Sequence, residues 1–176
     1  MIAPEIETAV NTALGGSMRL VQPATGYRAA IDPVFLAASV RCAAGDHVLD
    51  LGTGVGTAAL CLASRVDGVR VTGLELQPVL AELASINADD NNLSARISII
   101  EGDLRHHPFA AAAEAFDHVM ANPPYYKRGE GQISPNAIKA VANMEGEGGL
   151  SAWVAAGVEV LKPGGSISII HTAERL

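Results

Sequence analysis

The four residues from Asn122 to Tyr125, Asn-Pro-Pro-Tyr, directly follow the apolar segment 116–121. Two consecutive prolines must end a strand, because proline has no backbone N–H group. An amide or exocyclic amine is a poor nucleophile, because its lone pair is delocalised. Hydrogen bonds from that nitrogen to the Asn122 side-chain oxygen and the Pro123 carbonyl would aim the lone pair at a methyl group, and Tyr125 offers a flat face to a planar target. The motif predicts methyl transfer to nitrogen, with a mere strand terminator as the alternative.

A glycine-rich turn after the segment 47–51 is the second chemical signal. Asp50 lies near the end of this apolar strand, and Gly52, Gly54 and Gly56 follow at every second position. Such glycines allow a sharp turn at a helix start and let a ligand approach the backbone N–H groups. The turn predicts a cofactor site.

Two cofactor classes fit this turn. Residues 54–59 satisfy the relaxed dinucleotide fingerprint, with Glu75 at the expected distance, so an NAD(P)-dependent oxidoreductase is an alternative. Asp50, however, would place a negative charge beside a pyrophosphate, whereas a carboxylate suits the ammonium and sulfonium groups of S-adenosylmethionine. We therefore favour S-adenosylmethionine as the cofactor and S-adenosylhomocysteine as its product.

Acidic residues also follow the next two predicted strands. Glu75 is expected to accept hydrogen bonds from ribose hydroxyls, with a solvated surface acid as the alternative. Asp103 could accept a hydrogen bond from an adenine amino group, with a turn-forming role after Gly102 as the alternative. Asp103 and its neighbour Leu104 complete the predicted cofactor-binding residues.

The elements that must position these residues alternate along the chain. The predicted strands are 47–51, 69–75, 97–101, 116–121 and 166–171, and the predicted helices between them are 55–64, 78–91 and 150–161. This alternation predicts a doubly wound α/β fold, with a parallel sheet between two layers of helices. The candidate residues then share the carboxyl edge of the sheet, where ligands bind in such folds.

The chain divides into a predicted N-terminal extension, residues 1–45, and a cofactor-binding domain, residues 46–176. Residues 1–17 are expected to be a loose leader. Short strand candidates at 19–22 and 27–31 flank a Pro-Ala-Thr-Gly turn and predict a hairpin. A helix over 34–42 is expected to follow, with Asp32 as its N-cap.

Composition narrows the class of protein. The 176 residues are 49% hydrophobic and 18% charged, which suits one core and excludes a disordered chain. The formal net charge of −7 means that any contact with nucleic acid must come from a local basic patch. No apolar run approaches the ~18 residues of a membrane span, and no signal peptide is visible, so a cytoplasmic protein is expected.

Several other side chains are given structural interpretations. Cys42 and Cys61 lie in helix-like stretches and are expected to be buried free thiols. The adjacent His106 and His107 point apart, so no metal site is expected. Trp153 is interpreted as a core anchor, and His171 as structural or solvent-exposed.

On these motifs the sequence resembles a known family. The loop 50–56, Glu75, Asp103 and the 122–125 motif are similar to the Asn-Pro-Pro-Tyr class of S-adenosylmethionine-dependent methyltransferases, which modify adenine N6, cytosine N4 or glutamine amides. The lead-in 19–37 is similar to that of the bacterial adenine-N6-methyltransferases that modify valine tRNA beside the anticodon. The resemblance extends over residues 19–176.

The resemblance implies a Rossmann-like methyltransferase sheet and a role for each motif. It places Asp50, Gly52 and Gly54 on the methyl donor, Glu75 on its ribose and Asp103 on its adenine. Asn122 and Pro123 would orient the target amine, and Tyr125 would stack on the base.

The resemblance to tRNA-modifying enzymes directs attention to basic residues near these motifs. Arg28, Lys127 and Arg128 are candidate phosphate contacts, and a solvated face is an equally good interpretation of them. The polar segment 127–149 is expected to be a loop that faces the substrate.

Two further expectations concern the ends of the chain. Methylation of protein glutamine amides is the same-class alternative, but it normally requires a separate helical N-terminal domain, for which the 46 residues before the first core strand are too few. Members of the class usually continue past the fifth strand into a helix and an antiparallel hairpin. The C-terminal strands are therefore expected to be missing and the chain to be a fragment, with an edge covered by a partner or a naturally short protein as the alternatives.

Overall fold

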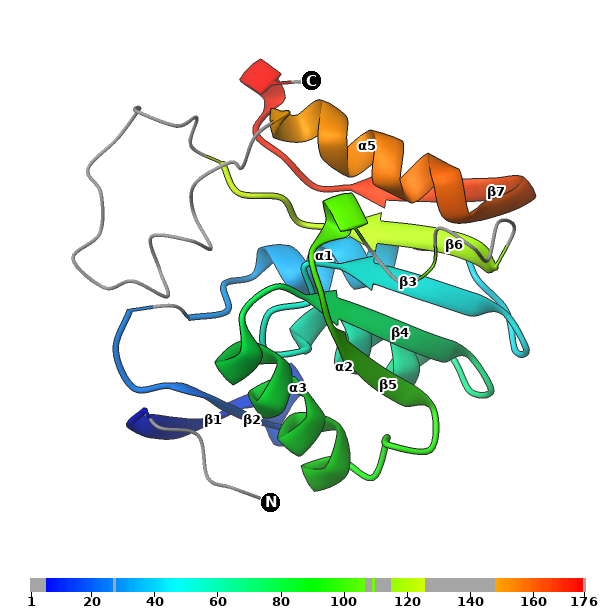
Figure 1. The fold of residues 1–176 in the computed structure, drawn as a ribbon. Helices are drawn as coiled ribbons and strands as arrows, with labels where there is room; N and C mark the ends of the chain where they lie inside the picture. The colour runs from blue at the N-terminus through cyan, green and yellow to red at the C-terminus, as the bar shows by residue number, and fades with distance from the viewer. Residues whose placement is uncertain (1–5, 27, 107–108, 110–114, 126–147, 176) are drawn as a thin grey trace.

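Five parallel strands form the main sheet in the part of the chain that the computed structural model describes, residues 6–26, 28–106, 109, 115–125 and 148–175 (Figure 1). In chain order they are β3 (His47–Leu51), β4 (Arg70–Glu75), β5 (Ile97–Glu101), β6 (Phe116–Ala121) and β7 (Leu161–Ile169). Their order in space is β5-β4-β3-β6-β7, and every neighbouring pair is parallel.

The strand order reverses beside β3. The chain runs outward from β3 through β4 to β5, then returns to the other side of β3 to begin β6. In open α/β sheets such a switch point leaves a crevice at the carboxyl ends of the strands, where ligands bind. The segments after β3 and β6, which carry the glycine turn and the Asn-Pro-Pro-Tyr motif, therefore lie beside each other.

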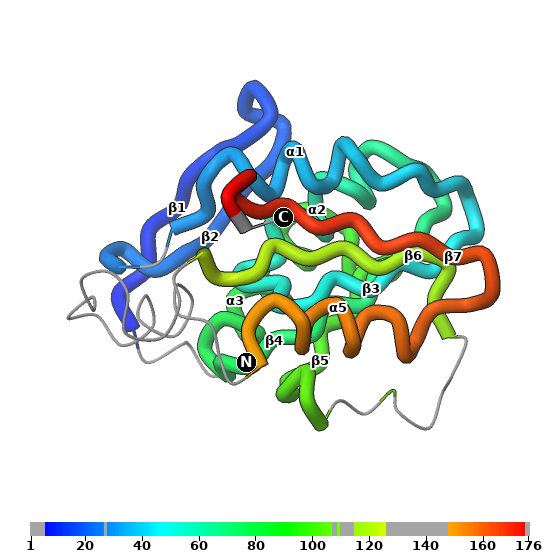
Figure 2. The backbone as a smooth tube through the Cα atoms, turned by 90° about the horizontal axis from the view of Figure 1, so that it is seen from above, coloured from blue at the N-terminus to red at the C-terminus, as the bar shows by residue number. Residues whose placement is uncertain are grey.

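Helices cover both faces of the sheet, with α1 and α2 on one side and α5 on the other (Figure 2). The helices are α1 (Asp32–Ser39), α2 (Thr57–Arg65), α3 (Pro78–Asp90) and α5 (Gly149–Val160). Alternate side chains of a strand point to opposite faces, so Val48 of β3 joins the core under α1, α2 and α3, and Leu49 and Leu51 join the core under α5. The doubly wound three-layer α/β fold predicted from the sequence is confirmed.

The predicted N-terminal hairpin is wrong in its pairing. The strand β2 (Met18–Pro23) pairs antiparallel with β1 (Thr8–Ala13), a segment expected to be a loose leader, and residues 28–31 form no strand. Leu14, Gly15 and Gly16 all have positive φ, which closes a tight connection between the two strands. The Pro-Ala-Thr-Gly segment instead leads away from β2 toward α1.

Two asparagines of α3 hold this hairpin against the domain. The Asn87 Oδ1 atom accepts a hydrogen bond from the Val21 N–H at 2.6 Å, and Asn87 Nδ2 donates to the Val21 carbonyl at 2.8 Å. Asn91, one turn later, makes the same pair of bonds with the Arg19 N–H and carbonyl. The side chains of α3 thus take the place of a neighbouring strand along the outer edge of β2.

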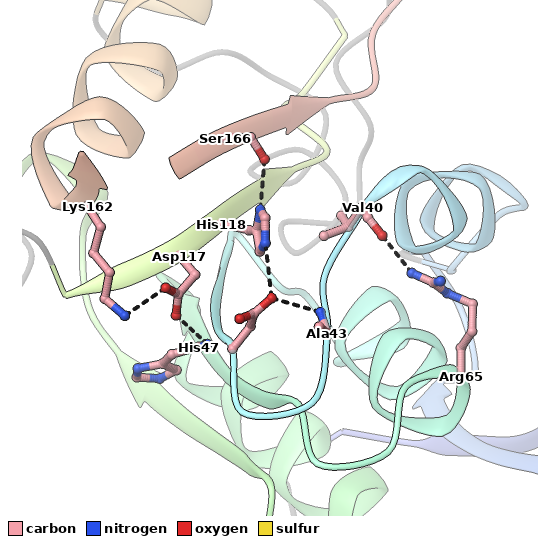
Figure 3. Close-up of polar contacts among 9 residues, drawn as sticks. Val40, Ala43, His47, Arg65, Asp117, His118, Lys162 and Ser166 are labelled. Carbon is pink, nitrogen blue, oxygen red and sulfur yellow. Dashed lines mark hydrogen bonds and ion pairs between the residues drawn. The ribbon is translucent and has the colours of Figure 1, made fainter. Parts of the chain in front are cut away.

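Polar contacts fix the register of the sheet at the amino ends of its central strands (Figure 3). The Asp117 carboxylate accepts from the His47 backbone N–H at 2.9 Å and from Lys162 Nζ at 2.7 Å, which ties β3, β6 and β7 together. His118 lies between Ser166 and Asp46 in the same region. These contacts lie at the opposite edge of the sheet from the predicted site.

Most predicted element boundaries agree with the structure. The bounds of β3, β5 and β6 are those predicted. The strand β7 begins earlier than predicted, at Leu161, because the Lys-Pro-Gly-Gly segment joins the sheet with a register shift opposite Phe116 and His118. Helix α1 starts at Asp32 and ends at Ser39, so it is shorter at its carboxyl end than predicted, and Asp32 makes no capping hydrogen bond.

Candidate functional site

A cavity of about 440 Å³ opens at the carboxyl edge of β3, β4 and β6. Its wall includes most of the predicted site residues, namely Arg28, Asp50, Gly52, Gly54, Glu75, Asp103, Leu104, Asn122, Pro123 and Tyr125. The carboxyl ends of several strands, the helices α1, α2 and α5 and the lead-in before α1 contribute to this one cavity. Except for Gly56, the residues that the sequence assigned to cofactor binding and to catalysis therefore share a single space.

Asp50 is a buried carboxylate in the wall of this cavity, with 2% of its surface exposed. It accepts a hydrogen bond from Thr53 Oγ1 at 2.6 Å. Burial raises the pKa of Asp50 to about 7, against the lowering effect of the Thr53 hydroxyl, and the nearby Glu75 raises it further. A cationic ligand group in the cavity would favour the ionised form of this carboxyl.

Glu75 ends β4 and is 5% exposed. Its Oε2 atom accepts from the Gly54 N–H and its Oε1 atom from the Gln77 N–H, both at 2.9 Å. Burial raises the pKa of Glu75, and these backbone N–H groups partly offset the effect. A carboxylate has about four lone-pair sites, so Glu75 keeps acceptor capacity for a ligand hydroxyl while it braces the glycine turn.

The backbone N–H groups of the glycine turn are used within the fold. Gly52 and Thr53 both donate to the Leu74 carbonyl, at 2.8 and 3.0 Å, and Gly54 donates to Glu75. A dinucleotide pyrophosphate is held by N–H groups at this position of a Rossmann turn. The turn presents a buried carboxylate where a pyrophosphate site would present free donors.

The three predicted glycines serve different purposes. All have positive φ, at +66° for Gly52, +60° for Gly54 and +84° for Gly56. Gly52 also lies under the Trp153 ring, since a Cβ atom built on it would be 2.5 Å from Trp153 Cη2. Gly56 does not line the cavity, and a Cβ atom there would press on Ala84 of α3.

Asp103 lies in the cavity wall with Arg105 of the short helix η2 (Leu104–His106) as its partner. The Arg105 Nη2 atom lies 2.5 Å from Asp103 Oδ2, and the Arg105 backbone N–H donates to Oδ1. The Arg105 guanidinium lowers the pKa of Asp103 to about 2. Asp103 therefore makes the turn that the alternative interpretation gave it, and it stays ionised at the cavity rim.

The Asn-Pro-Pro-Tyr motif leaves β6 and folds back on itself. The Tyr125 hydroxyl lies 2.9 Å from Asn122 Oδ1 and 3.0 Å from Asp32 Oδ2, and either oxygen can accept its single proton. The His171 ring meets the Tyr125 ring edge to face, with centroids 5.3 Å apart. Burial and the Asp32 carboxylate raise the pKa of Tyr125 to about 12, so its hydroxyl remains protonated near neutral pH.

Among the cavity residues that were not predicted, three have side chains able to contact a ligand or a site residue. Trp153 of α5, interpreted only as a core anchor, lines the cavity. Thr57, at the start of α2, also lines it, and its buried Oγ1 atom has no hydrogen-bond partner among the described residues. Asp32, expected to be an N-cap, directs its carboxylate to Tyr125. Thr57 lies within the fingerprint at 54–59 and Asp32 within the lead-in at 19–37, but neither segment assigned these side chains a chemical role.

Of the predicted phosphate contacts, only Arg28 lies in the described residues. It is exposed at the cavity wall, and its guanidinium donates to Asn11 Oδ1 of β1 at 3.0 Å. Lys127, Arg128 and the segment expected to face the substrate lie outside the described residues.

The described residues offer neither a metal cluster nor a membrane-spanning helix. They contain no group of three or more His, Cys, Asp or Glu side chains that could hold a metal ion. In the same residues, every helix is too short or too polar to cross a membrane.

Comparison with a family model gives one match, to a methyltransferase domain, over residues 48–149. Among curated proteins, the tRNA1(Val) (adenine(37)-N6)-methyltransferase of Porphyromonas gingivalis strain W83 is 34% identical over 132 residues, which are 74% of this chain and 51% of the relative. The release factor glutamine methyltransferase of Chlorobaculum tepidum is 37% identical over 95 residues, 53% of this chain and 32% of the relative. The chain thus spans about half the length of the tRNA methyltransferase and a third of the release-factor enzyme.

Solved structures share the fold. A predicted O-methyltransferase from Agrobacterium tumefaciens superposes with a TM-score of 0.63 and 27% identity, over 81% of this chain and 62% of the other. An S-adenosylmethionine-dependent methyltransferase from Thiobacillus denitrificans, in complex with S-adenosyl-L-homocysteine, gives a TM-score of 0.53 at 24% identity, over 78% and 47% of the two chains.

Proposed function

Since this chain belongs to the methyltransferase-domain family, we propose that it transfers a methyl group from S-adenosylmethionine to the N6 amine of an adenine in tRNA. One observation carries the proposal. The Asn-Pro-Pro-Tyr motif after β6 and the buried carboxylates Asp50 and Glu75 line the same cavity. This arrangement supports adjacent sites for a cationic donor and a planar amine.

The donor half of the cavity suits S-adenosylmethionine better than a dinucleotide. When bound, this cofactor supplies an electrophilic methyl group on a positively charged sulfur. Asp50 would attract its positive charges, Glu75 and the free Thr57 hydroxyl would bind its hydroxyl groups, and Asp103 with Leu104 would border the adenine. The internally bonded N–H groups of Gly52, Thr53 and Gly54 argue against a pyrophosphate at this turn.

The acceptor half works by alignment. Asn122 Oδ1 and the Pro123 carbonyl would accept the two hydrogens of the target amine, which turns its lone pair toward the donor. The Tyr125 ring would hold the base by stacking. Positioning of this kind accelerates transfer without a strong general base, since the proton can leave after the methyl group has arrived.

The names of the relatives support tRNA as the substrate. The Porphyromonas relative is named for adenine N6 of tRNA1(Val), and it matches three quarters of this chain. Arg28 at the cavity wall, together with Lys127 and Arg128, would bind phosphates as the local basic patch, and such a substrate agrees with a cytoplasmic location. In this proposal residues 1–45 are the extension that carries Arg28 to the cavity and residues 46–176 are the methyltransferase domain.

The test is transfer of labelled methyl groups from S-adenosylmethionine to unmodified tRNA transcripts, followed by nucleoside analysis. Label in N6-methyladenosine is expected for the parent chain. The Asn122→Ala variant should bind S-adenosylhomocysteine as the parent does but transfer methyl groups roughly 10²-fold more slowly, because one positioned polar group is lost.

Parallel reactions with a release factor distinguish the same-class alternative. Label in a glutamine side chain of the release factor, with none in tRNA, would replace the proposed substrate and keep the chemistry. Quenching of NADH fluorescence without binding of S-adenosylhomocysteine would overturn the proposal and favour an oxidoreductase.

A further inference from the structure

The hydroxyl group of Tyr125 has two acceptors and one proton. It lies 3.0 Å from the Asp32 carboxylate and 2.9 Å from the Asn122 side-chain oxygen. A phenol donates one full hydrogen bond, so these two oxygens compete for it. Asn122 is the residue whose oxygen must accept a hydrogen from the target amine in the proposed function.

The competition favours Asp32. A hydrogen bond to a carboxylate is about twice as strong as one to a neutral amide. Asp32 is held in place because α1 packs on the main core through the buried residues Leu36 and Ala37. The acceptor that draws the Tyr125 proton is therefore fixed by the fold.

The ring of Tyr125 is fixed as well. The ring of His171, which follows β7, packs edge to face against the Tyr125 ring, with the two ring planes at 89°. With ring and acceptor both fixed, the hydroxyl group has little freedom except the rotation of its proton between Asp32 and Asn122.

We propose that Asp32 is a positioning residue for methyl transfer, which takes the hydrogen bond of the Tyr125 hydroxyl and so leaves the Asn122 side-chain oxygen available to the target amine. This inference rests on the proposed function and adds a residue to it. Asp32 does not touch the reacting atoms, and it acts through Tyr125. The contact also joins Asp32, 93 residues before Tyr125 in sequence, to the motif across the cavity wall.

The test is a double-mutant cycle with Asp32→Asn and Tyr125→Phe, measured as kcat and KM for methyl transfer to tRNA. Asparagine keeps the size of the side chain but is a weaker acceptor, so the Tyr125 proton shifts toward Asn122. We expect Asp32→Asn to lower kcat about tenfold, the difference between a charge-assisted and a neutral hydrogen bond. In the Tyr125→Phe background the same change should lower kcat by less than about twofold, because no hydroxyl proton remains to be redirected.

Two controls separate this role from others. Asp90→Asn removes one negative charge from an exposed ion pair with Arg19, far from the cavity, and reports the general effect of charge on RNA binding. That general effect would lower KM, whereas the proposed role lowers kcat. Binding of S-adenosylhomocysteine, measured by calorimetry, should be the same in all four proteins of the cycle if each is folded.

The outcomes are distinct. The role of Asp32 would be overturned if Asp32→Asn lowered kcat tenfold equally in the Tyr and Phe backgrounds, or if it lowered kcat in neither. The proposed function would then remain intact. A parent chain that methylates neither tRNA nor a release factor would overturn the proposed function, and the role of Asp32 with it. A loss of kcat on Asp32→Asn that disappears in the Phe background supports the proposal.

Discussion

Asp50 is the residue in which the proposed function and the stability of the fold are most clearly opposed. Its carboxylate is buried in the cavity wall and has no cationic partner among the described residues, only the Thr53 hydroxyl and a backbone N–H group. Burial of an uncompensated charge costs free energy, which appears here as a raised pKa. A cationic donor would supply the missing partner, so the cost is recovered when the ligand binds.

This opposition predicts the pH dependence of an Asp50→Asn variant. The pKa of Asp50 is about 7 in the folded chain, against 3.8 for an unperturbed aspartate. The carboxyl group therefore stays protonated up to a higher pH in the folded state than in the unfolded state. The buried Asp50 carboxylate therefore does not destabilise the folded state below about pH 4, and it destabilises it fully above about pH 7. At about pH 8 the variant should be more stable than the parent by roughly 2–4 kcal/mol, and at about pH 4 the two should be equal.

Urea unfolding at the two pH values measures this difference, and calorimetry should show that the variant has lost affinity for S-adenosylmethionine. Equal free energies of unfolding at the higher pH, or donor binding unchanged in the variant, would contradict the role given to Asp50. The matched control is Asp46→Asn, which removes a carboxylate that lies at the opposite edge of the sheet and contacts His118 and the Ala43 N–H.

At the scale of elements, α3 substitutes for a strand. Its residues Asn87 and Asn91 are four apart, so they lie on one face of the helix, and Val21 and Arg19 are two apart on β2, so their N–H and C=O groups point the same way. Asn87 is fully buried and also donates to the Val55 carbonyl beside the glycine turn. The helix thereby joins the N-terminal hairpin to the glycine turn.

The two asparagines form a matched pair for mutagenesis. Asn87→Ala leaves buried N–H and C=O groups of Val21 unpaired, and we expect a loss of about 2–4 kcal/mol in the free energy of unfolding. Asn91→Ala removes the equivalent bonds at a more exposed position, where water replaces them, and should cost less than about 1 kcal/mol. Chemical denaturation of both variants at one pH checks this, and equal losses would show that the pairing with β2 does not depend on burial.

The elements that the sequence predicted well are those with a local cause. The strands β3, β5 and β6 are apolar runs that end at glycine or proline, and their predicted bounds are those found. The hairpin was predicted with the wrong partner, because β1 alternates between exposed and half-buried residues and is weakly apolar. Its pairing depends on contacts with α3, 66 or more residues away, which no local pattern contains.

The candidate site shows the same difference between residues placed by a local pattern and residues placed by long-range packing. Asp50, Glu75 and Asn122 were found because each stands at a strand end in a motif whose chemistry is readable. Asp32, Thr57 and Trp153 were missed because their place in the wall depends on how α1, α2 and α5 pack. Arg105 was missed as the partner of Asp103, although it lies only two residues away. The sequence alone does not decide whether the Asp103 carboxylate pairs with a ligand or with a neighbouring arginine.

For the whole molecule, the residues proposed to bind the donor lie together at the switch point of the sheet. Asp50, Thr57, Glu75 and Asp103 all lie between residues 47 and 104, inside the region that matches the methyltransferase domain. The net charge of −7 opposes RNA over most of the surface but does not act against a small cationic donor. Binding of the donor and turnover of the large substrate are thus separable properties.

This separation predicts that the chain as it stands binds S-adenosylhomocysteine, even without an RNA substrate. At a ligand concentration of about 100 times Kd, linkage adds roughly 2.7 kcal/mol to the free energy of unfolding. For a domain of this size each kcal/mol raises Tm by about 2–4 °C, so we expect a shift of about 5–10 °C. Thermal unfolding with S-adenosylhomocysteine, adenosine and NADH measures it, and adenosine should give a smaller shift, because it lacks the ammonium group that Asp50 would attract. A larger shift with NADH than with S-adenosylhomocysteine would mean that the buried carboxylates do not select the ligand, and it would reverse the choice between the two cofactor classes.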